Sequence, residues 1–158
     1  MLVLDDGRMA VPYWARQARH NEAYYSGGTF DRHSLIGWAI WAKDRIGGLR
    51  ADDYGCFSLA GCLVEGGSLC INYATEPGGW IRAALYEDLP HPPQKTQPLE
   101  GYDFEDCDTL IGDESERKVS WQGSTNLSKF AGKKLTVRFE MMRATLFAWT
   151  LGRPGHVS

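Results

Sequence analysis

The chain has 158 residues, of which 43% are apolar and 23% are charged, and its formal net charge is −3. These values are typical of a globular chain with a sizeable core, so intrinsic disorder and coiled coils are not expected. The lysines and arginines are scattered, so nucleic acid is not an expected partner. No run approaches the roughly 18 consecutive apolar residues of a membrane helix, so we expect no membrane partner either.

The amino-terminal sequence MLVLDDGRMA carries two aspartates where a secretory signal has basic residues and then an apolar run. We therefore expect a cytoplasmic protein as the chain stands, or a secreted one if it is part of a longer precursor. Four cysteines (Cys56, Cys62, Cys70 and Cys107) lack zinc-ligand spacing. Buried thiols are expected; a Cys56–Cys62 or Cys62–Cys70 disulfide is the alternative in an exported protein.

Apolar residues alternate with polar ones between glycines, asparagines and prolines that recur about every eight to twelve residues, which predicts an all-β fold. In chain order, strands are expected over 22–28, 35–43, 55–61, 68–75 and 80–89. The EPGG sequence at 76–79 is expected to form a turn. The proline-rich segment 90–101 is expected to be an exposed connection, because proline cannot donate to a strand ladder.

The carboxyl-terminal third predicts an irregular acidic segment over 104–114 and then a strand over 117–121. Two longer strands, 134–142 and 144–151, are expected to pair as a hairpin through residues 142–144. Ile81, Ala83 and Leu85, and then Leu135, Val137, Phe139 and Met141, should point inward, with Leu127 and Phe130 closing the sandwich edge. We predict an all-β, antiparallel, jelly-roll-type β-sandwich over 48–152, preceded by an amino-terminal strand or hairpin region over 1–47 and followed by a tail over 153–158.

The sequence YDFEDCDTLIGDESERKVSWQGSTNLSKFAGKKLTVRFEMMRATLFAW resembles the carboxyl-terminal β-sandwich of β-propeller glycoside hydrolases of the sucrose-hydrolase-like group. GLRADDYGCFSLAG, LCINYAT and GGWIRAALYED are similar to upstream parts of the same domain, with Cys56 as an inserted residue. The likeness spans residues 49–151, about two thirds of the chain. The matching positions are Asp106, Cys107, Gly112, Asp113, Val119, Trp121, Gly123, Leu127, Gly132, Lys133, Leu135, Arg138, Phe139, Leu146 and Phe147.

This resemblance implies that residues 1–47 correspond to the last strands of a propeller and that the remainder is an accessory sandwich. Glycosidases use two carboxylates on either side of the scissile bond, and in that family both come from earlier propeller blades. We therefore expect no catalytic residues here and no catalysis by this chain alone.

Six tryptophans and seven tyrosines supply flat aromatic faces, on which sugar rings stack. Trp80, beside the EPGG sequence, and Trp14 are the candidate carbohydrate-binding residues, with Arg82 and Asn72 as hydrogen-bonding neighbours of Trp80. Core packing is the alternative for any aromatic residue of a sandwich. Core positions are expected for the remaining tryptophans of the strand rows, Trp38, Trp41, Trp121 and Trp149.

Asp106, Asp108, Asp113 and Glu114 crowd one irregular segment, where carboxylate oxygens could bind calcium. Their spacing is not that of an EF-hand, and a solvated turn with local hydrogen bonds is the alternative. No other cofactor is expected. The sequence thus predicts a non-catalytic carbohydrate-associated module that binds a glycan or serves a glycoside hydrolase. The alternatives are a structural module that contacts a propeller domain or another copy of itself, and a part of a glycosidase completed by another polypeptide.

Overall fold

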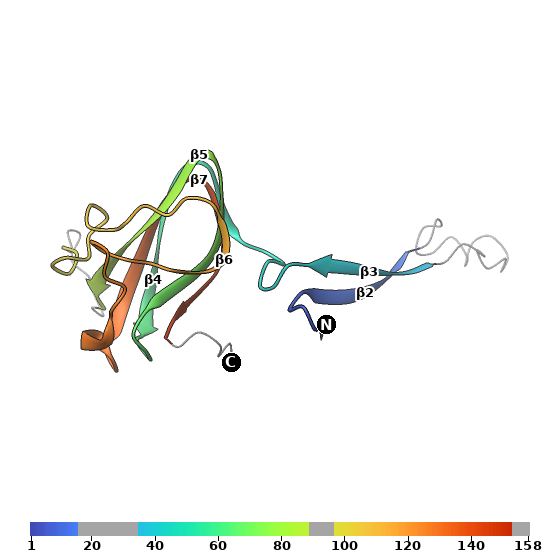
Figure 1. Cartoon of the computed structure of the whole chain (residues 1–158), viewed down its shortest axis with the longest axis horizontal. Helices are drawn as coiled ribbons and strands as arrows, with labels where there is room; N and C mark the ends of the chain where they lie inside the picture. The colour runs from blue at the N-terminus through green and yellow to red at the C-terminus, as the bar shows by residue number, and fades with distance from the viewer. Residues whose placement is uncertain (16–34, 89–96, 153–158) are drawn as a thin grey trace, which may run out of the picture. The chain divides into compact units, whose positions relative to one another are not determined.

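A computed structural model describes residues 1–15, 35–88 and 97–152. The chain divides into two compact units, Met1–Ile46 and Gly47–Ser158, here called the first and second units. Both are built from antiparallel strands (Figure 1), which confirms the all-β prediction. The jelly-roll topology and the likeness of the first unit to a propeller end stay predictions. The expected strand over 22–28 and the tail over 153–158 lie outside the described residues.

The first unit contains a sheet with the order β1-β2-β3. Its strands are β1 (Leu2–Val3), β2 (Met9–Ala15) and β3 (Leu35–Trp41). β3 confirms the strand expected near its position, whereas β2 was not predicted. Pro12 argues against a central strand, but β1 pairs only with Met9 and Ala10. From Val11 onward that side of β2 has no strand partner among the described residues, so proline is tolerated there.

The second unit contains a four-stranded antiparallel sheet with the order β4-β7-β5-β6. Its strands are β4 (Leu49–Leu63), β5 (Leu69–Glu87), β6 (Asp113–Lys118) and β7 (Lys134–Leu151), and a 3-10 turn, η1 (Ser128–Phe130), precedes β7. The register shifts twice between β4 and β7 and twice between β5 and β7. Such bulges bend strands. Figure 1 shows β5 and β7 arching over, so that the halves of each strand face one another.

The core lies inside this arch. The predicted inward rows of β5 and β7 are confirmed, because Ile81, Ala83, Leu85, Leu135, Val137, Phe139 and Met141 all have exposed fractions of 3% or less. Leu69, Ile71 and Tyr73 from the other half of β5 belong to the same cluster. Leu127 is fully buried and Phe130 nearly so, as predicted. The folded-over sheet thus encloses one core with its two halves.

Two breaks that the sequence predicted are not present. Residues 76–79 lie within β5, and residues 142–144 lie within β7, so neither segment ends its strand. Thr75 pairs with Ala144 and Trp80 pairs with Met142, which leaves residues 76–79 as a bulge opposite Arg143. Gly78 and Arg143 both have positive φ, 79° and 46°. The turn-forming residues therefore mark a shared bend of two paired strands rather than two turns.

Two smaller predictions also differ from the structure. The strand expected over 117–121 is β6, which begins at Asp113 and ends at Lys118. Its sequence, DESERK, contains no alternation of apolar and polar residues that would predict a strand. β6 is recognised as a strand only because it pairs with β5. Of the tryptophans expected in core rows, Trp121 is buried and Trp149 packs partly against the core, but Trp38 is 51% exposed.

Candidate functional site

The candidate site lies on the face of the β4-β7-β5 sheet that points away from the core, here called the outer face. Trp80 of β5 is the cross-strand partner of Met142 in β7, which is also the partner of Tyr54 in β4. Cross-strand partners share a face, and neighbouring strands lie ~4.8 Å apart. Tyr54 is 56% exposed, while Trp80 and Met142 are half-buried. Two aromatic rings and a thioether therefore form one row across three strands.

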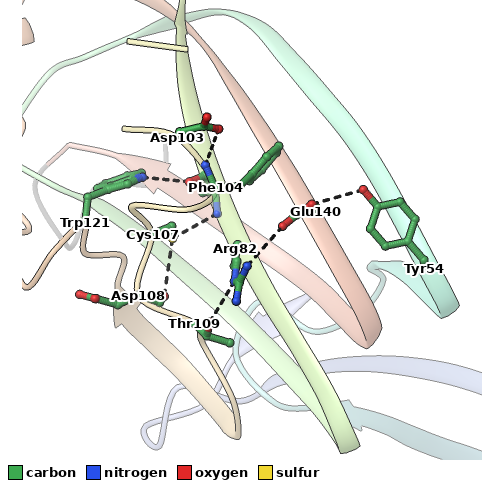
Figure 2. A network of polar contacts seen from close by, with 10 residues as sticks. Tyr54, Arg82, Asp103, Phe104, Cys107, Asp108, Thr109, Trp121 and Glu140 are labelled. Atoms are coloured by element: carbon green, nitrogen blue, oxygen red, sulfur yellow. Dashed lines mark hydrogen bonds and ion pairs between the residues drawn. The ribbon is translucent and has the colours of Figure 1, made fainter. Parts of the chain in front are cut away.

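Polar groups lie beside this row, and Figure 2 shows Arg82, Thr109 and Glu140 together with Tyr54. The guanidinium carbon of Arg82 lies 5.1 Å from the centroid of the Trp80 ring. The Nε of Arg82 donates to Oγ1 of Thr109 at 2.9 Å, and its Nη1 lies 4.0 Å from Oε1 of Glu140. The Tyr54 hydroxyl donates to Oε2 of Glu140 at 3.3 Å. We call the set of Tyr54, Trp80, Arg82, Glu140 and Met142 the aromatic platform.

The charged side chains of the platform are partly buried. The side chains of Arg82 and Glu140 are 37% and 15% exposed. Partial burial, followed by the proximity of Cys56 and Glu140, raises the pKa of Tyr54. The Tyr54 hydroxyl is therefore protonated at neutral pH and can donate and accept hydrogen bonds. The platform combines apolar ring faces with donors and acceptors at its rim.

Cys56, the inserted residue of the family-like segment, also lies on the outer face, opposite Glu140. Arg138 donates from Nε to its Sγ at 3.1 Å, and this contact raises the pKa of Arg138. All four cysteines are free thiols, and Cys56 is exposed while the other three are buried. The expectation of buried thiols is thus wrong for Cys56, because it occupies an outward position of β4.

The four predicted carbohydrate-binding residues do not all lie together in the structure. Trp80 and Arg82 lie together on the platform. Asn72 is only 3% exposed, in the half of β5 that precedes the bulge, so its amide has almost no surface to offer a ligand. Trp14 belongs to the first unit, where it is 64% exposed. Sequence reasoning missed Tyr54, Glu140 and Met142, because only the strand register places them beside Trp80.

The predicted calcium ligands do not converge. Asp106 accepts hydrogen bonds from Gln122 Nε2 at 2.7 Å and from the backbone N–H of Asp103 at 3.2 Å. Asp108 accepts from the Ser120 hydroxyl at 2.5 Å and from the backbone N–H of Gly123 at 2.9 Å. These two bonds lower the pKa of Asp108, the Ser120 contact contributing most.

Asp113 and Glu114 lie instead in β6, opposite Ala74 and Tyr73, and Glu114 lies 3.7 Å from Arg117. Across residues 1–15, 35–88 and 97–152, no three His, Cys, Asp or Glu side chains are grouped so that they could hold a metal ion. Asp106 and Asp108 therefore accept local hydrogen bonds, Asp113 and Glu114 belong to β6, and calcium binding by these residues stays a prediction.

Cys107 and Trp121, two residues of the family-like motif, have a structural role at the edge of β5. The backbone N–H of Ala83 donates to Cys107 Sγ at 3.3 Å, and Trp121 Nε1 donates to the Ala83 carbonyl at 2.9 Å (Figure 2). Burial raises the pKa of Cys107 to about 11. Two side chains thus replace a neighbouring strand at Ala83, where exposed backbone groups would otherwise need another partner.

A separate pocket of about 390 Å³ lies where the ends of β4 and β7 meet. It is lined by Cys62, Leu63, Glu65, Trp149, Thr150, Leu151 and Gly152. Glu65 is the single carboxylate among the described residues that line it, whereas glycosidases place two carboxylates across the scissile bond.

The described part of the chain contains no helix with the length and apolarity needed to cross a membrane. Comparison with protein-family models, with curated proteins and with solved structures finds no match to this chain.

Proposed function

We propose that the second unit, Gly47–Ser158, is a non-catalytic carbohydrate-binding module that holds a glycan on the aromatic platform. The observation that carries this proposal is that Trp80 shares one sheet face with Tyr54, while Arg82 packs against the Trp80 ring. Aromatic rings offer the apolar C–H faces of sugars a flat surface. The neighbouring charged groups supply hydrogen bonds to the hydroxyls.

The polar groups of the platform are held in place before a ligand arrives. Arg82 is fixed by Thr109 and by the Trp80 ring, and Glu140 accepts a bond from Tyr54. Because these side chains are already ordered, binding loses less side-chain entropy than it would at a flexible site. In this proposal Arg82 donates to sugar hydroxyls, and Glu140 and Tyr54 accept from them.

The spacing of the platform favours a chain of sugars over a single one. Trp80 and Tyr54 are separated by β7, so their backbones lie ~10 Å apart, twice the strand spacing. One sugar ring cannot stack on both aromatics at this distance, whereas two or more linked rings can. We therefore expect an oligosaccharide or the interior of a polysaccharide as ligand.

The resemblance to the sandwich of sucrose-hydrolase-like glycosidases supports a sugar ligand and an accessory role, within a jelly-roll-type module. A structural or assembly role is the second candidate, and the exposed apolar side chains of the first unit favour it.

As a third candidate, the chain contributes part of the active site of a glycosidase that another polypeptide completes. Hydrolysis that appears only when such a partner is added would favour this candidate.

Affinity electrophoresis of the full chain in gels that contain soluble β-glucans, fructans or xylans tests the proposal. We expect one of these polysaccharides to retard the wild type, and Trp80→Ala to abolish the retardation. Leu63→Ala is the matched control, because Leu63 is 46% exposed at the far end of β4, and it should migrate like the wild type. Migration that no polysaccharide alters would refute a glycan-binding function.

A further inference from the structure

The first unit presents a continuous apolar face. The register of β2 and β3 places Pro12 opposite Trp38 and Trp14 opposite Ile36. Cross-strand partners share a face, so these residues and Ile40 lie on the same side. The exposed fractions are 64% for Trp14, 79% for Ile36, 51% for Trp38 and 48% for Ile40. We call this surface the apolar face; it consists of Ala10, which is buried, and of Pro12, Trp14, Ile36, Trp38 and Ile40, which are exposed.

A sheet of three strands does not bury such a face by itself. Independent stability of a small sheet requires a second layer against its apolar side. Contiguous exposed apolar surface of this kind marks interaction sites in soluble proteins. The sequence predicted Trp38 to lie in the core, yet it is exposed in the single chain. This exposure is explained if another molecule packs against the sheet and supplies the second layer.

We propose that a second copy of this chain covers the apolar face, so that two first-unit sheets pack face to face around a two-fold axis. In such an interface each patch meets its own equivalent, and like charges would face each other. None of the six residues of the apolar face is charged. The composition of this face thus suits contact with itself.

The area available fits a reversible dimer. With about 250 Å² for a tryptophan and somewhat less for an isoleucine, the four exposed side chains leave on the order of 500 Å² of uncovered apolar surface per copy. Two copies would bury about 1,000 Å², which is below the ~1,200 Å² at which stable interfaces begin and within the range of weak, transient ones. We therefore expect association in the micromolar range rather than a permanent dimer.

The chemistry of the apolar face differs from that of the aromatic platform. The platform sets Arg82 and Glu140 beside its rings, whereas branched Ile36 and Ile40 lie beside the tryptophans of the apolar face. A glycan there would find no side-chain hydrogen-bonding groups apart from the indole N–H groups. A protein surface of the same apolar character is the better match, and this proposal is independent of glycan binding by the second unit.

Sedimentation velocity of the full chain, from low to high micromolar concentration, tests the proposal. The wild type should shift from monomer to dimer. Ile36→Lys should weaken the dimer at least about tenfold, because it would bury an unpaired ammonium group. Leu35→Lys is the matched control, since Leu35 is the preceding residue of β3, is 70% exposed and points to the opposite face; its dimer should be of wild-type strength.

Two further measurements keep the test decisive if Ile36→Lys does not fold. Ile36→Ala adds no charge and should weaken the dimer less than Ile36→Lys but more than Leu35→Lys. Tryptophan emission of the wild type should shift to shorter wavelength as concentration rises, because Trp14 and Trp38 become buried. A wild type that stays monomeric, or equal weakening by the substitutions at 35 and 36, overturns the proposal. Retention on an insoluble polysaccharide that Ile36→Lys abolishes would assign the face to a glycan instead.

Discussion

The backbone of Gly79 in β5 lies directly against the carbonyl group of Arg143 in β7. A Cβ atom at position 79 would collide with that carbonyl and would also approach the carbonyl oxygen of Met142 to 2.8 Å. The contact occurs where both strands bend, immediately before Trp80 pairs with Met142. The same close approach therefore bends the sheet and sets the position of the aromatic platform.

Gly79→Ala should lower the free energy of unfolding by about 1–3 kcal/mol, because the methyl group must displace backbone that cannot move freely. Urea unfolding monitored by tryptophan fluorescence measures this loss. Gly47→Ala is the control, since no atom lies within 4 Å of a Cβ at that position, and it should be neutral within about 0.5 kcal/mol. Equal losses in the two variants would show that the bend tolerates a side chain.

Leu127→Ala should destabilise the second unit by about 2–5 kcal/mol, the range for a fully buried leucine. Leu63→Ala deletes the same atoms from a side chain that is 46% exposed, and it should cost less than about 1 kcal/mol. Thermal and urea unfolding of both variants give the comparison. A Leu127→Ala loss no larger than that of Leu63→Ala would mean that the loop before β7 does not close the core.

Asp108 should make the free energy of unfolding change with pH in the acid range. Its bonds from Ser120 and Gly123 hold its pKa below the usual range in the folded state. Its contribution is thus present above the unfolded pKa of about 4 and is lost as the pH falls through the lower folded value. Asp108→Asn should cost at most about 1 kcal/mol at pH 7, because solvent screens this exposed carboxylate, and the difference should shrink at acid pH. Unfolding at several pH values checks this, and a constant difference would exclude the role.

Thiol reactivity should distinguish Cys56 from the other three cysteines. Burial raises the pKa of Cys62 and, to about 11, that of Cys107, whereas Cys56 is exposed on the outer face. A disulfide reagent at pH 8 should therefore modify one thiol quickly in the native protein and four in denaturant. Cys56→Ser should remove the fast phase. Rapid modification of two or more thiols in the native state would contradict the described burial.

Much of the core follows from the sequence, because alternation reports which side of a strand is apolar. The inward rows of β5 and β7 are predictable in this way, since residues 135–141 alternate strictly and residues 81–85 do so except at Ala84, which is apolar and buried. Alternation does not report where a strand bends or which strand it pairs with. For this reason the sequence predicts a turn at EPGG and divides the continuous β7 into a hairpin.

The candidate site could be predicted only in part. Trp80 and Arg82 are two residues apart on one strand, so their shared face follows from the strand period of two. Tyr54 and Glu140 join them only through the pairing of β4 and β5 with β7. The burial of Asn72 and the exposure of Trp38 likewise depend on packing rather than on local pattern.

Isothermal titration with an oligosaccharide of the polysaccharide that retards the protein tests the aromatic platform most directly. We predict binding by the wild type, a loss of at least about tenfold in Trp80→Ala, and near-complete retention in Trp80→Phe, which keeps an aromatic face. Leu63→Ala should bind as the wild type does. Wild-type affinity in Trp80→Ala, with the fold intact, would contradict the assignment of this face as the glycan site.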